Sequence, residues 1–188
     1  MITLVVANQK GGVGKTTTAL NLAASLSAAS RKVLLIDLDS QKNASSASGV
    51  DNITSKLSLL DALVDDKPIN SLILKTDYKF DIIPASQDLI SAEMELMNAN
   101  NPTSILKEKL SVIKNKYDYL VIDCPPSLGM LSVSALRAAD KVLIPLQCEY
   151  YSLEGLAAMN QTIGEINAST GDKICLLYTS DAADERRR

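Results

Sequence analysis

Short apolar runs alternate along the chain with stretches in which apolar residues recur at helical spacing. Five runs rich in Val, Ile and Leu have the length and composition of strands buried on both faces of a sheet. These predicted strands span residues 2–7, 32–37, 80–85, 117–126 and 141–147. After the first strand, Ala19, Leu22, Ala23 and Leu26 form the apolar stripe of an amphipathic helix. Further helices are predicted at 58–66, 87–98, 103–115, 130–138 and 152–167, and residues 38–49 are predicted to form a polar loop.

This alternation predicts an α/β fold with a mostly parallel β-sheet flanked by helices, because parallel neighbours need crossover connections. The 188 residues suffice for one domain with a substantial core, and we find no internal repeat or linker. Hydrophobic residues make up 46% of the sequence and aromatic residues only 4%, so the core is expected to be aliphatic.

Charge and residue types exclude several classes of function. The formal net charge is −3, so the chain as a whole is not a polycation, although a local basic patch is compatible with it. The absence of histidine excludes histidine metal sites, Ser-His-Asp triads and histidine pH switches. Cys124, Cys148 and Cys175 lack metal-binding spacing and, without a secretory signal, indicate a reducing cytoplasm. No apolar run is long enough to span a bilayer.

The last residues have a separate origin in our interpretation. "CLLYTSDAADE", Cys175 to Glu185, resembles the translation of a transposase-type sequencing adapter, TGT CTC TTA TAC ACA TCT GAC GCT GCC GAC, followed by GA and a purine. The alternative is an ordinary strand followed by an acidic turn, which makes the match of eleven residues a coincidence. We therefore expect residues 1–174 to be the N-terminal fragment of a longer protein and residues 175–188 to be non-native.

A glycine-rich loop follows the first strand in "NQKGGVGKTTTALN" (8–21). The phosphate-loop pattern G-x-x-x-x-G-K-[ST] is met at Gly14, Lys15 and Thr16, but Gln9 replaces its first glycine. Glycines allow successive N–H groups to point into one concavity, and the following helix directs its positive end there. We expect Lys15 to bridge the terminal phosphates of a nucleotide and the Thr16 hydroxyl to bind Mg²⁺. The alternative is a plain turn between a strand and a helix.

Three carboxylates stand at the carboxyl ends of predicted strands. Asp37 and Asp39 lie at the carboxyl end of the second strand, and Asp123 directly follows the apolar run of the fourth. Ligands bind at this edge of open α/β sheets, and a phosphate hydrolase needs carboxylates near Mg²⁺ and near the attacking water. The alternative is that each carboxylate only caps a turn.

The segment Lys10 to Thr16 matches K-G-G-x-G-K-[ST] at every fixed position, so the chain resembles the deviant Walker A P-loop ATPases. This family includes the ParA and Soj partition proteins, MinD, nitrogenase iron protein and the arsenite-pump ATPase. The resemblance implies ATP and Mg²⁺ as cofactors and a nucleotide-sandwich homodimer in which Lys10 reaches the partner's phosphates. The alternative for Lys10 is a solvated loop lysine. The implied nucleotide-binding residues are Lys10, Gly11, Gly12, Val13, Gly14, Lys15, Thr16 and Thr17.

The resemblance also assigns roles to the carboxylates. Asp39 would position or activate the attacking water and is, with Lys10 and Lys15, one of the implied catalytic residues. The implied magnesium site consists of Thr16, Asp37 and Asp123, with Asp123 acting through a bound water.

Two further segments favour the ParA/Soj members of this family. "DLDSQKNAS" resembles D-[LI]-D-P-Q-[GA]-N-A, with Ser40 and Lys42 as departures that could alter loop stiffness and hydrolysis rate. "DCPPSLG" matches the ParA form in full, and "AADKVLIPLQCEYYSLEGL" is close to it. Cys124 and Cys148 are expected to be small core residues. Tyr150, Tyr151 and Glu154 are expected either to pack or to lie near the nucleotide or the dimer face.

A ParA/Soj-type ATPase would be an ATP-dependent dimerisation switch for chromosome or plasmid partition. It would act with a ParB-like activator and bind DNA without sequence specificity, largely through a C-terminal region that is missing here. We expect it in the cytoplasm, on the nucleoid and not on a membrane. The alternatives are a MinD-like membrane-positioning ATPase, a ParA-like ATPase that positions a protein cargo, and an inactive fragment.

Overall fold

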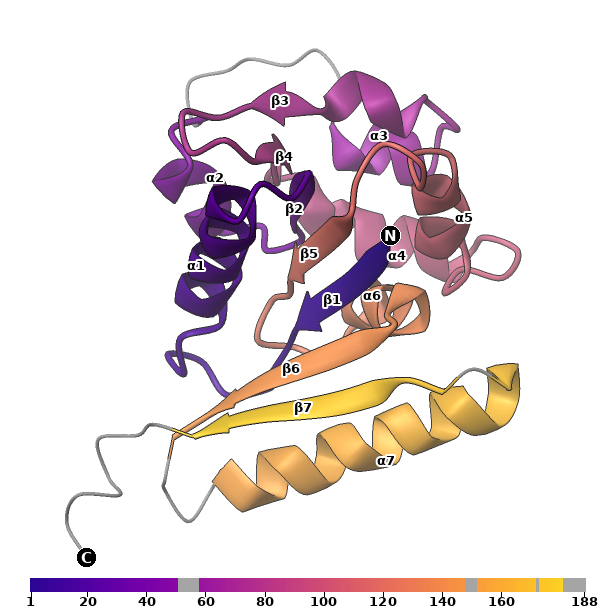
Figure 1. The fold of residues 1–188 in the computed structure, drawn as a ribbon. Coiled ribbons are helices and arrows are strands. Elements are labelled where there is room, and N and C mark those ends of the chain that lie inside the picture. The colour runs from indigo at the N-terminus through magenta and orange to yellow at the C-terminus, as the bar shows by residue number, and fades with distance from the viewer. Residues whose placement is uncertain (51–57, 148–151, 172, 181–188) are drawn as a thin grey trace, which may run out of the picture.

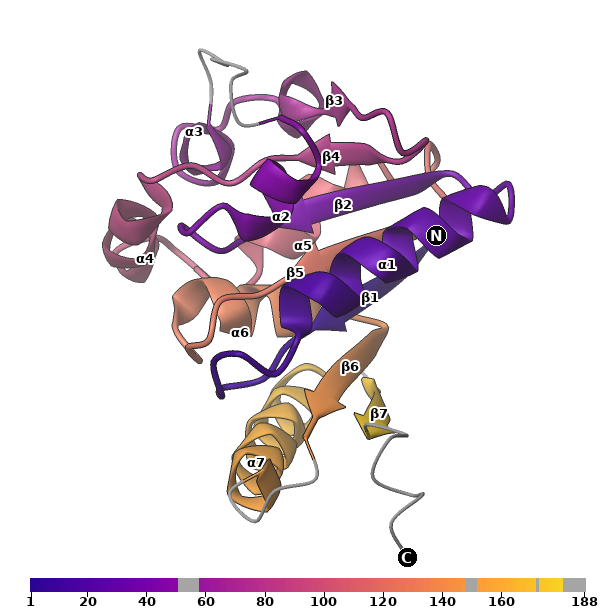
Figure 2. The same ribbon diagram turned by 90° about the vertical axis from the view of Figure 1, so that its left-hand side faces the viewer.

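A seven-stranded sheet forms the centre of the structure, a computed structural model that describes residues 1–50, 58–147, 152–171 and 173–180 (Figures 1 and 2). Its strand order is β3-β4-β2-β5-β1-β6-β7. The strands are β1 (Ile2–Val6), β2 (Val33–Asp37), β3 (Leu74–Lys75), β4 (Asp81–Ile83), β5 (Tyr119–Asp123), β6 (Lys141–Leu146) and β7 (Cys175–Ser180). All neighbouring strands pair in parallel except the edge strand β3, which is antiparallel to β4.

The strand register brings the carboxyl ends of three central strands to one edge of the sheet. Val6 at the end of β1 lies opposite Asp123 of β5, and Asp37 at the end of β2 lies opposite Asp123 from the other side. Each strand is five residues long, so the three strands also begin together at the other edge. The glycine loop and the two carboxylates are therefore neighbours because of strand pairing alone.

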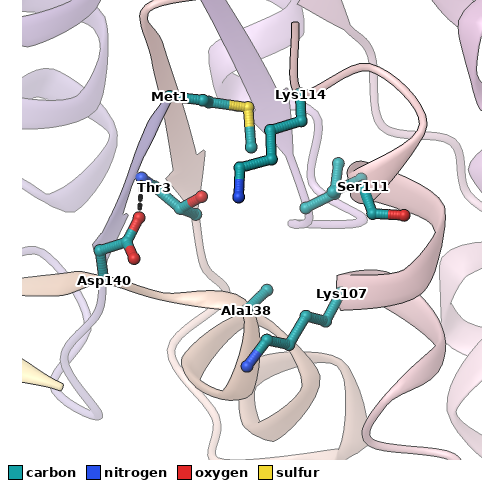
Figure 3. A pocket seen from close by; sticks show the side chains of 8 residues that line it. Met1, Thr3, Lys107, Ser111, Lys114, Ala138 and Asp140 are labelled. Atoms are coloured by element: carbon teal, nitrogen blue, oxygen red, sulfur yellow. Dashed lines mark hydrogen bonds between the residues drawn. The ribbon is translucent and has the colours of Figure 1, made fainter. Parts of the chain in front are cut away.

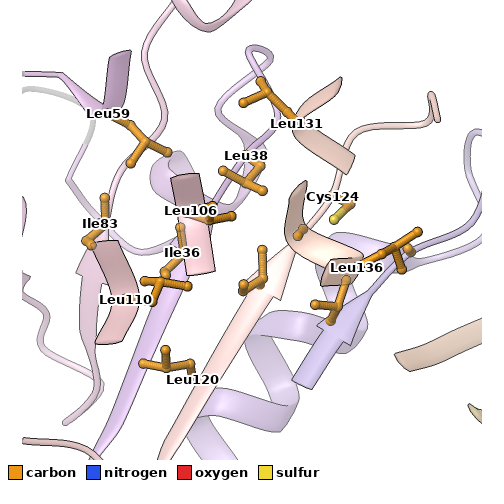
Figure 4. Packing of buried hydrophobic residues seen from close by; sticks show 14 of the residues in the cluster. Ile36, Leu38, Leu59, Ile83, Leu106, Leu110, Leu120, Cys124, Leu131 and Leu136 are labelled. Carbon is orange, nitrogen blue, oxygen red and sulfur yellow. The ribbon is translucent and has the colours of Figure 1, made fainter. Parts of the chain in front are cut away.

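Helices cover both faces of this sheet. The helices are α1 (Lys15–Ala28), α2 (Asn43–Ala47), α3 (Leu59–Leu63), α4 (Leu89–Met97), α5 (Ile105–Ser111), α6 (Met130–Ala138) and α7 (Ser152–Thr170), with a 3-10 turn at Ile69–Leu72. Helices α1 and α2 pack on one face, and α3 to α7 pack on the other. Side chains of β2 alternate between the two faces of the sheet. Leu35 packs in a cluster with residues of α1, whereas Leu34 and Ile36 belong to the larger core. Figure 4 shows Ile36 within that larger core.

The predicted α/β fold is confirmed, and the differences have local causes. Strand β5 stops at Asp123 rather than at 126, because Pro125 and Pro126 lack the N–H groups that a sheet ladder requires. The short helix α2 lies inside the segment that we predicted to be a polar loop. Strand β3 was also missed, because two residues carry too little periodicity to identify a strand. Helix α7 extends to Thr170, three residues beyond its predicted end.

The segment that we attribute to adapter translation begins with a strand. Residues Cys175–Ser180 form β7, which pairs in parallel with the whole of β6, from Lys141 to Leu146. A hexapeptide beside the open edge of a parallel strand gains ladder hydrogen bonds whatever its coding origin. The non-native origin of residues 175–188 therefore stays a prediction.

Helix α4 offers a test of this packing with its own internal control. Leu96 is 1% exposed and belongs to the larger core, whereas Met94 on the same helix is 67% exposed. We expect Leu96→Ala to lower the free energy of unfolding by about 2–5 kcal/mol, because it leaves a cavity. Met94→Ala should change it by less than about 0.5 kcal/mol. Urea denaturation measures both, and equal effects would contradict the orientation of α4.

Candidate nucleotide-binding site

The loop between β1 and α1 has the backbone conformation of a phosphate cradle. Gly12 and Gly14 have φ angles of 74° and 87°, in the left-handed region that glycine adopts without steric cost. Gly14 is the N-cap of α1, and Thr18 N–H donates to its carbonyl at 2.8 Å. The free N–H groups of the first helical turn consequently face the loop, where they attract an anion.

Asn8 fixes this loop to β6, the strand beside β1 in the sheet. Its Nδ2 donates to the carbonyl of Pro145 in β6 at 2.8 Å, and its Oδ1 accepts from the N–H of Lys10 at 3.0 Å. The side chain is only 4% exposed, so both hydrogen bonds are made away from solvent. Asn8 is not among the site residues predicted from the sequence. The available signal was a polar residue placed directly after a buried strand.

Lys15 is held inside the loop. Its side chain is 7% exposed, and its Nζ donates to the carbonyl of Lys10 at 3.0 Å. Burial lowers the pKa of Lys15, and the negative charges of Asp123 and Asp39 oppose that shift. The ammonium therefore lies between the glycine loop and two carboxylates, at the point where a nucleotide's terminal phosphates would need a cation.

Asp37 anchors the loop that carries Asp39. Its Oδ2 accepts from both the N–H and the hydroxyl of Ser45, at 2.8 and 2.7 Å, and its Oδ1 accepts from the N–H of Asp39 at 3.0 Å. The Ser45 hydroxyl in turn accepts from Ala85 N–H at 2.9 Å, which ties in the segment after β4. Burial raises the pKa of Asp37, and the hydrogen bonds from Ser45 and Asp39 oppose that shift. Its contribution to a magnesium site stays a prediction.

Asp123 is buried without a hydrogen-bond partner. The residue is 0% exposed, and neither carboxyl oxygen has a partner among the described residues. Burial raises the pKa of Asp123 to about 7, and the charges of Asp37 and Asp39 add to the rise. The nearby Thr16 hydroxyl and the Lys15 ammonium oppose it, although Thr16 does not meet hydrogen-bond geometry. Two orphaned buried oxygens are costly unless a further group binds there.

An open cavity of about 380 Å³ lies between the glycine loop and the loop after β2. This volume is in the range of small-ligand sites. Its lining consists of Gly11, Gly12, Gly14, Lys15, Thr16, Thr17, Asp39, Gln41, Asn43 and Pro126. Most of the expected nucleotide-binding residues and the expected catalytic Asp39 are thus brought together. Four expected residues do not line the cavity: Lys10, which is half-buried, and Val13, Asp37 and Asp123, which are buried.

The donor set around the cavity fits Mg²⁺. Magnesium is commonly held by one or two carboxylates, a hydroxyl, waters and substrate phosphates rather than by a closed protein cage. Asp123 offers unpartnered carboxyl oxygens and Thr16 a neighbouring hydroxyl, beside Asp39. Among the described residues no cluster of three or more acidic or thiol side chains forms a complete metal cage. A cation here would therefore depend on the nucleotide's oxygens as well.

Cys124 is a core residue, as expected, because it is 1% exposed and burial raises the pKa of its thiol. Cys148, Tyr150 and Tyr151 lie outside the described residues, as does the side chain of Glu154. Within the described part of the chain, none of the helices has the length and apolar character that crossing a membrane requires.

A parallel sheet, a glycine loop that opens a helix, and carboxylates at the same sheet edge define a P-loop nucleotide-binding protein. Residues 1–176 match the protein family described as AAA domain. The chain belongs to this family and, within it, to the ParA/Soj group.

Two similar proteins carry the names ParA and Soj. The chain is 52% identical over 163 residues to the chromosome partitioning protein ParA of Myxococcus xanthus, covering 85% of this chain and 57% of that protein. It is 46% identical over 161 residues to the sporulation initiation inhibitor protein Soj of Bacillus subtilis, covering 85% and 64%. The chain thus spans less than two thirds of the length of either relative.

A solved structure shares the fold at a TM-score of 0.91 and 36% identity, covering 96% of this chain and 74% of the other. It is that of cobyrinic acid a,c-diamide synthase from Mycobacterium smegmatis, with bound ADP and magnesium.

The hydroxyl of Ser45 provides a test of the Asp37 anchor. We expect Ser45→Ala to lower the free energy of unfolding by about 1–3 kcal/mol, because Asp37 loses a donor and Ala85 N–H loses its acceptor. The matched control is Ser25→Ala on the exposed face of α1, which should change stability by less than about 0.5 kcal/mol. Urea denaturation measures the difference, and a neutral Ser45→Ala would contradict an anchoring role.

Proposed function

We propose that the whole protein is an ATP-dependent dimerisation switch that hydrolyses ATP to partition DNA with a ParB-like activator. The observation that carries this proposal is a phosphate loop that faces Asp39 across one cavity. The same loop contains a second lysine, Lys10, five residues before Lys15. The relative named as a chromosome partitioning protein supports the biological role. The same proposal places the protein in the cytoplasm, on the nucleoid.

In the proposed reaction, the glycine loop and the first turn of α1 bind the phosphates through backbone N–H groups. Lys15 already points into the loop, and it would exchange the carbonyl of Lys10 for a phosphate oxygen. Thr16 and Asp123 would hold Mg²⁺ together with the phosphates, and the ion would supply charge neutralisation. Asp39 lines the cavity and has its Oδ1 fixed by Gln41 N–H at 2.9 Å, so its carboxylate is placed to orient a water molecule.

Lys10 would couple nucleotide binding to self-association. Its backbone lies in the loop, where its carbonyl contacts Lys15 and its N–H contacts Asn8. A cation beside one nucleotide site can pair with the triphosphate of a second copy that faces it. Desolvated contacts between opposite charges are strong, so dimer affinity would depend on the γ-phosphate and fall after hydrolysis.

Variants of the two loop lysines distinguish nucleotide binding from dimerisation. In the product of the uninterrupted gene, we expect Lys15→Ala to weaken nucleotide binding about 30-fold or more, because a partly buried phosphate contact is lost. Lys10→Ala should retain nucleotide binding as a monomer but weaken the ATP-dependent dimer by a similar factor. Calorimetry with a non-hydrolysable ATP analogue measures the first property, and sedimentation velocity measures the second.

Lys67→Ala is the control for both measurements, because Lys67 is exposed on a distant loop. A dimer that forms equally well with Lys10→Ala, or without nucleotide, would contradict the switch.

Sequencing the parent gene past the codon for Ile174 tests the interpretation of the tail. We expect the reading frame to continue with a further strand and helix region, and not with the codons for Cys175 to Arg188. A stop codon directly after Arg188 in the genome would contradict the adapter origin. The neighbouring genes distinguish a DNA cargo from a protein cargo, because a ParB-like gene with centromere repeats favours DNA partition.

A further inference from the structure

A second open cavity, of about 410 Å³, lies at the edge of the sheet opposite the nucleotide site. It is formed where β2, β4 and β5 begin, three strands that are adjacent in the sheet. The lining residues are Arg31, Lys32, Val33, Lys75, Lys79, Asp81, Lys116 and Tyr117. We call it the cationic cavity, because five of these eight side chains carry a positive charge.

Among the lining residues of this cavity, five positive charges face one carboxylate, and the exposed Asp77 and Asp118 beside it reduce the local excess. Asp81 is its one lining carboxylate, and its Oδ2 contacts Lys75 Nζ at 2.8 Å and accepts from the Tyr117 hydroxyl at 2.7 Å. The other four cations, Arg31, Lys32, Lys79 and Lys116, make no ion pair with any described residue. A formal balance of +4 among the lining residues contrasts with a net charge of −3 for the chain.

The backbone of the surrounding loops is held by hydrogen bonds, so these cations are displayed on a fixed frame. Lys32 N–H donates to Asp118 Oδ2 at 2.9 Å, and Asp118 N–H donates back to the carbonyl of Lys32 at 2.8 Å. In the β3–β4 turn, the Thr76 hydroxyl donates to the carbonyl of Phe80 at 2.6 Å. The charged ends remain in solvent, because the five cationic residues are exposed.

The cationic surface continues along the same sheet edge. Beside the start of β1 a smaller cavity of about 160 Å³ is lined by Lys107 and Lys114, with Met1, Thr3 and Asp140 (Figure 3). Asp140 Oδ2 accepts from the N–H of Thr3 at 2.7 Å, so this carboxylate has a backbone partner. Lys114 is only two residues from Lys116 of the cationic cavity. Together the two cavities extend the basic surface across β4, β2, β5 and β1.

We propose that the cationic cavity binds the sugar-phosphate backbone of duplex DNA. This inference deepens the proposed function, on which it rests, by placing a DNA contact within residues 31–117. Exposed lysines from three separate loops suit a series of phosphates spread along a duplex, and such contacts carry no sequence information. A lipid surface would need apolar anchors, yet the apolar lining side chain, Val33, is 2% exposed.

The position of the cavity allows nucleotide and DNA to bind at the same time. Strand β2 begins in the cationic cavity at Val33 and ends at Asp37 beside the nucleotide site. Five residues of strand separate the two edges by about 15 Å. A second copy that closes over the nucleotide edge would leave the cationic edge open. A dimer would therefore present two such surfaces.

The test compares salt dependence of DNA binding between two variants of the full chain with equal charge. Lys79→Gln with Lys116→Gln removes two lysines of the cavity, and Lys67→Gln with Lys173→Gln removes two exposed lysines elsewhere. Fluorescence anisotropy of a labelled mixed-sequence duplex gives the affinity across a salt series. The slope of log K against log salt should become shallower by about 1.8 in the cavity variant, or 0.9 for each lost phosphate contact. The control variant should keep the slope of the unaltered chain.

Three further measurements decide between sources of the binding. A non-hydrolysable ATP analogue should not displace the duplex, and displacement would overturn the inference by placing the DNA phosphates in the nucleotide loop. Inorganic phosphate should displace the duplex no better than chloride at equal ionic strength, and specific competition would indicate a discrete phosphate site instead. Binding to phosphatidylglycerol vesicles without binding to duplex would also overturn it.

Failure of this inference is distinguishable from failure of the proposed function. The cavity variant should keep the nucleotide affinity and the ATP-dependent dimerisation of the unaltered chain, because no lining residue touches the nucleotide cavity. An equal loss of DNA binding in both lysine variants would overturn the cavity assignment and leave the switch intact. If the unaltered protein does not dimerise in the presence of ATP, the proposed switch function is wrong.

Discussion

Parallel pairing of β5 with both β1 and β2 is the constraint on which the rest of this structure depends. One strand register places Val6 and Asp37 on either side of Asp123. That register brings together the loop after β1, the loop after β2 and a buried carboxylate, although they come from three distant parts of the sequence. A shift of one residue in β5 would turn Asp123 to the other face and dissolve the site.

The loops around the site are held by hydrogen bonds, whereas the buried carboxylate inside it has none from the described residues. Asn8 and Asp37 have hydrogen bonds on their side-chain polar atoms, and they hold the two loops on opposite sides of the cavity. Asp123 lies between them with two buried oxygens that have no partner among the described residues. Such a frame favours a ligand that brings its own cation, because the charge and hydrogen bonds that Asp123 lacks arrive with it.

Local sequence patterns predicted those elements and residues whose placement depends on nearby residues in the chain. Five of the seven strands, the helix after the glycine loop, and the positions of Lys15 and Asp39 follow from apolar runs and from short motifs. The Asn8–Pro145 and Ser45–Ala85 contacts could not be predicted, because each joins residues that only the folded sheet brings together. The cationic cavity could not be predicted from the sequence either. Its charges are scattered from Arg31 to Lys116, and a net charge of −3 conceals them.

The burial of Cys124 gives this protein an internal reporter. The thiol is one residue beyond Asp123, inside the core and with its pKa raised by burial, whereas Cys175 is exposed. Thiolate is the reactive form, so an alkylating reagent reaches Cys124 only when the strand end beside the nucleotide cavity opens. The labelling rate of this one sulfur atom therefore measures how often that part of the core opens. A ligand that stabilises the closed core would slow the labelling in proportion.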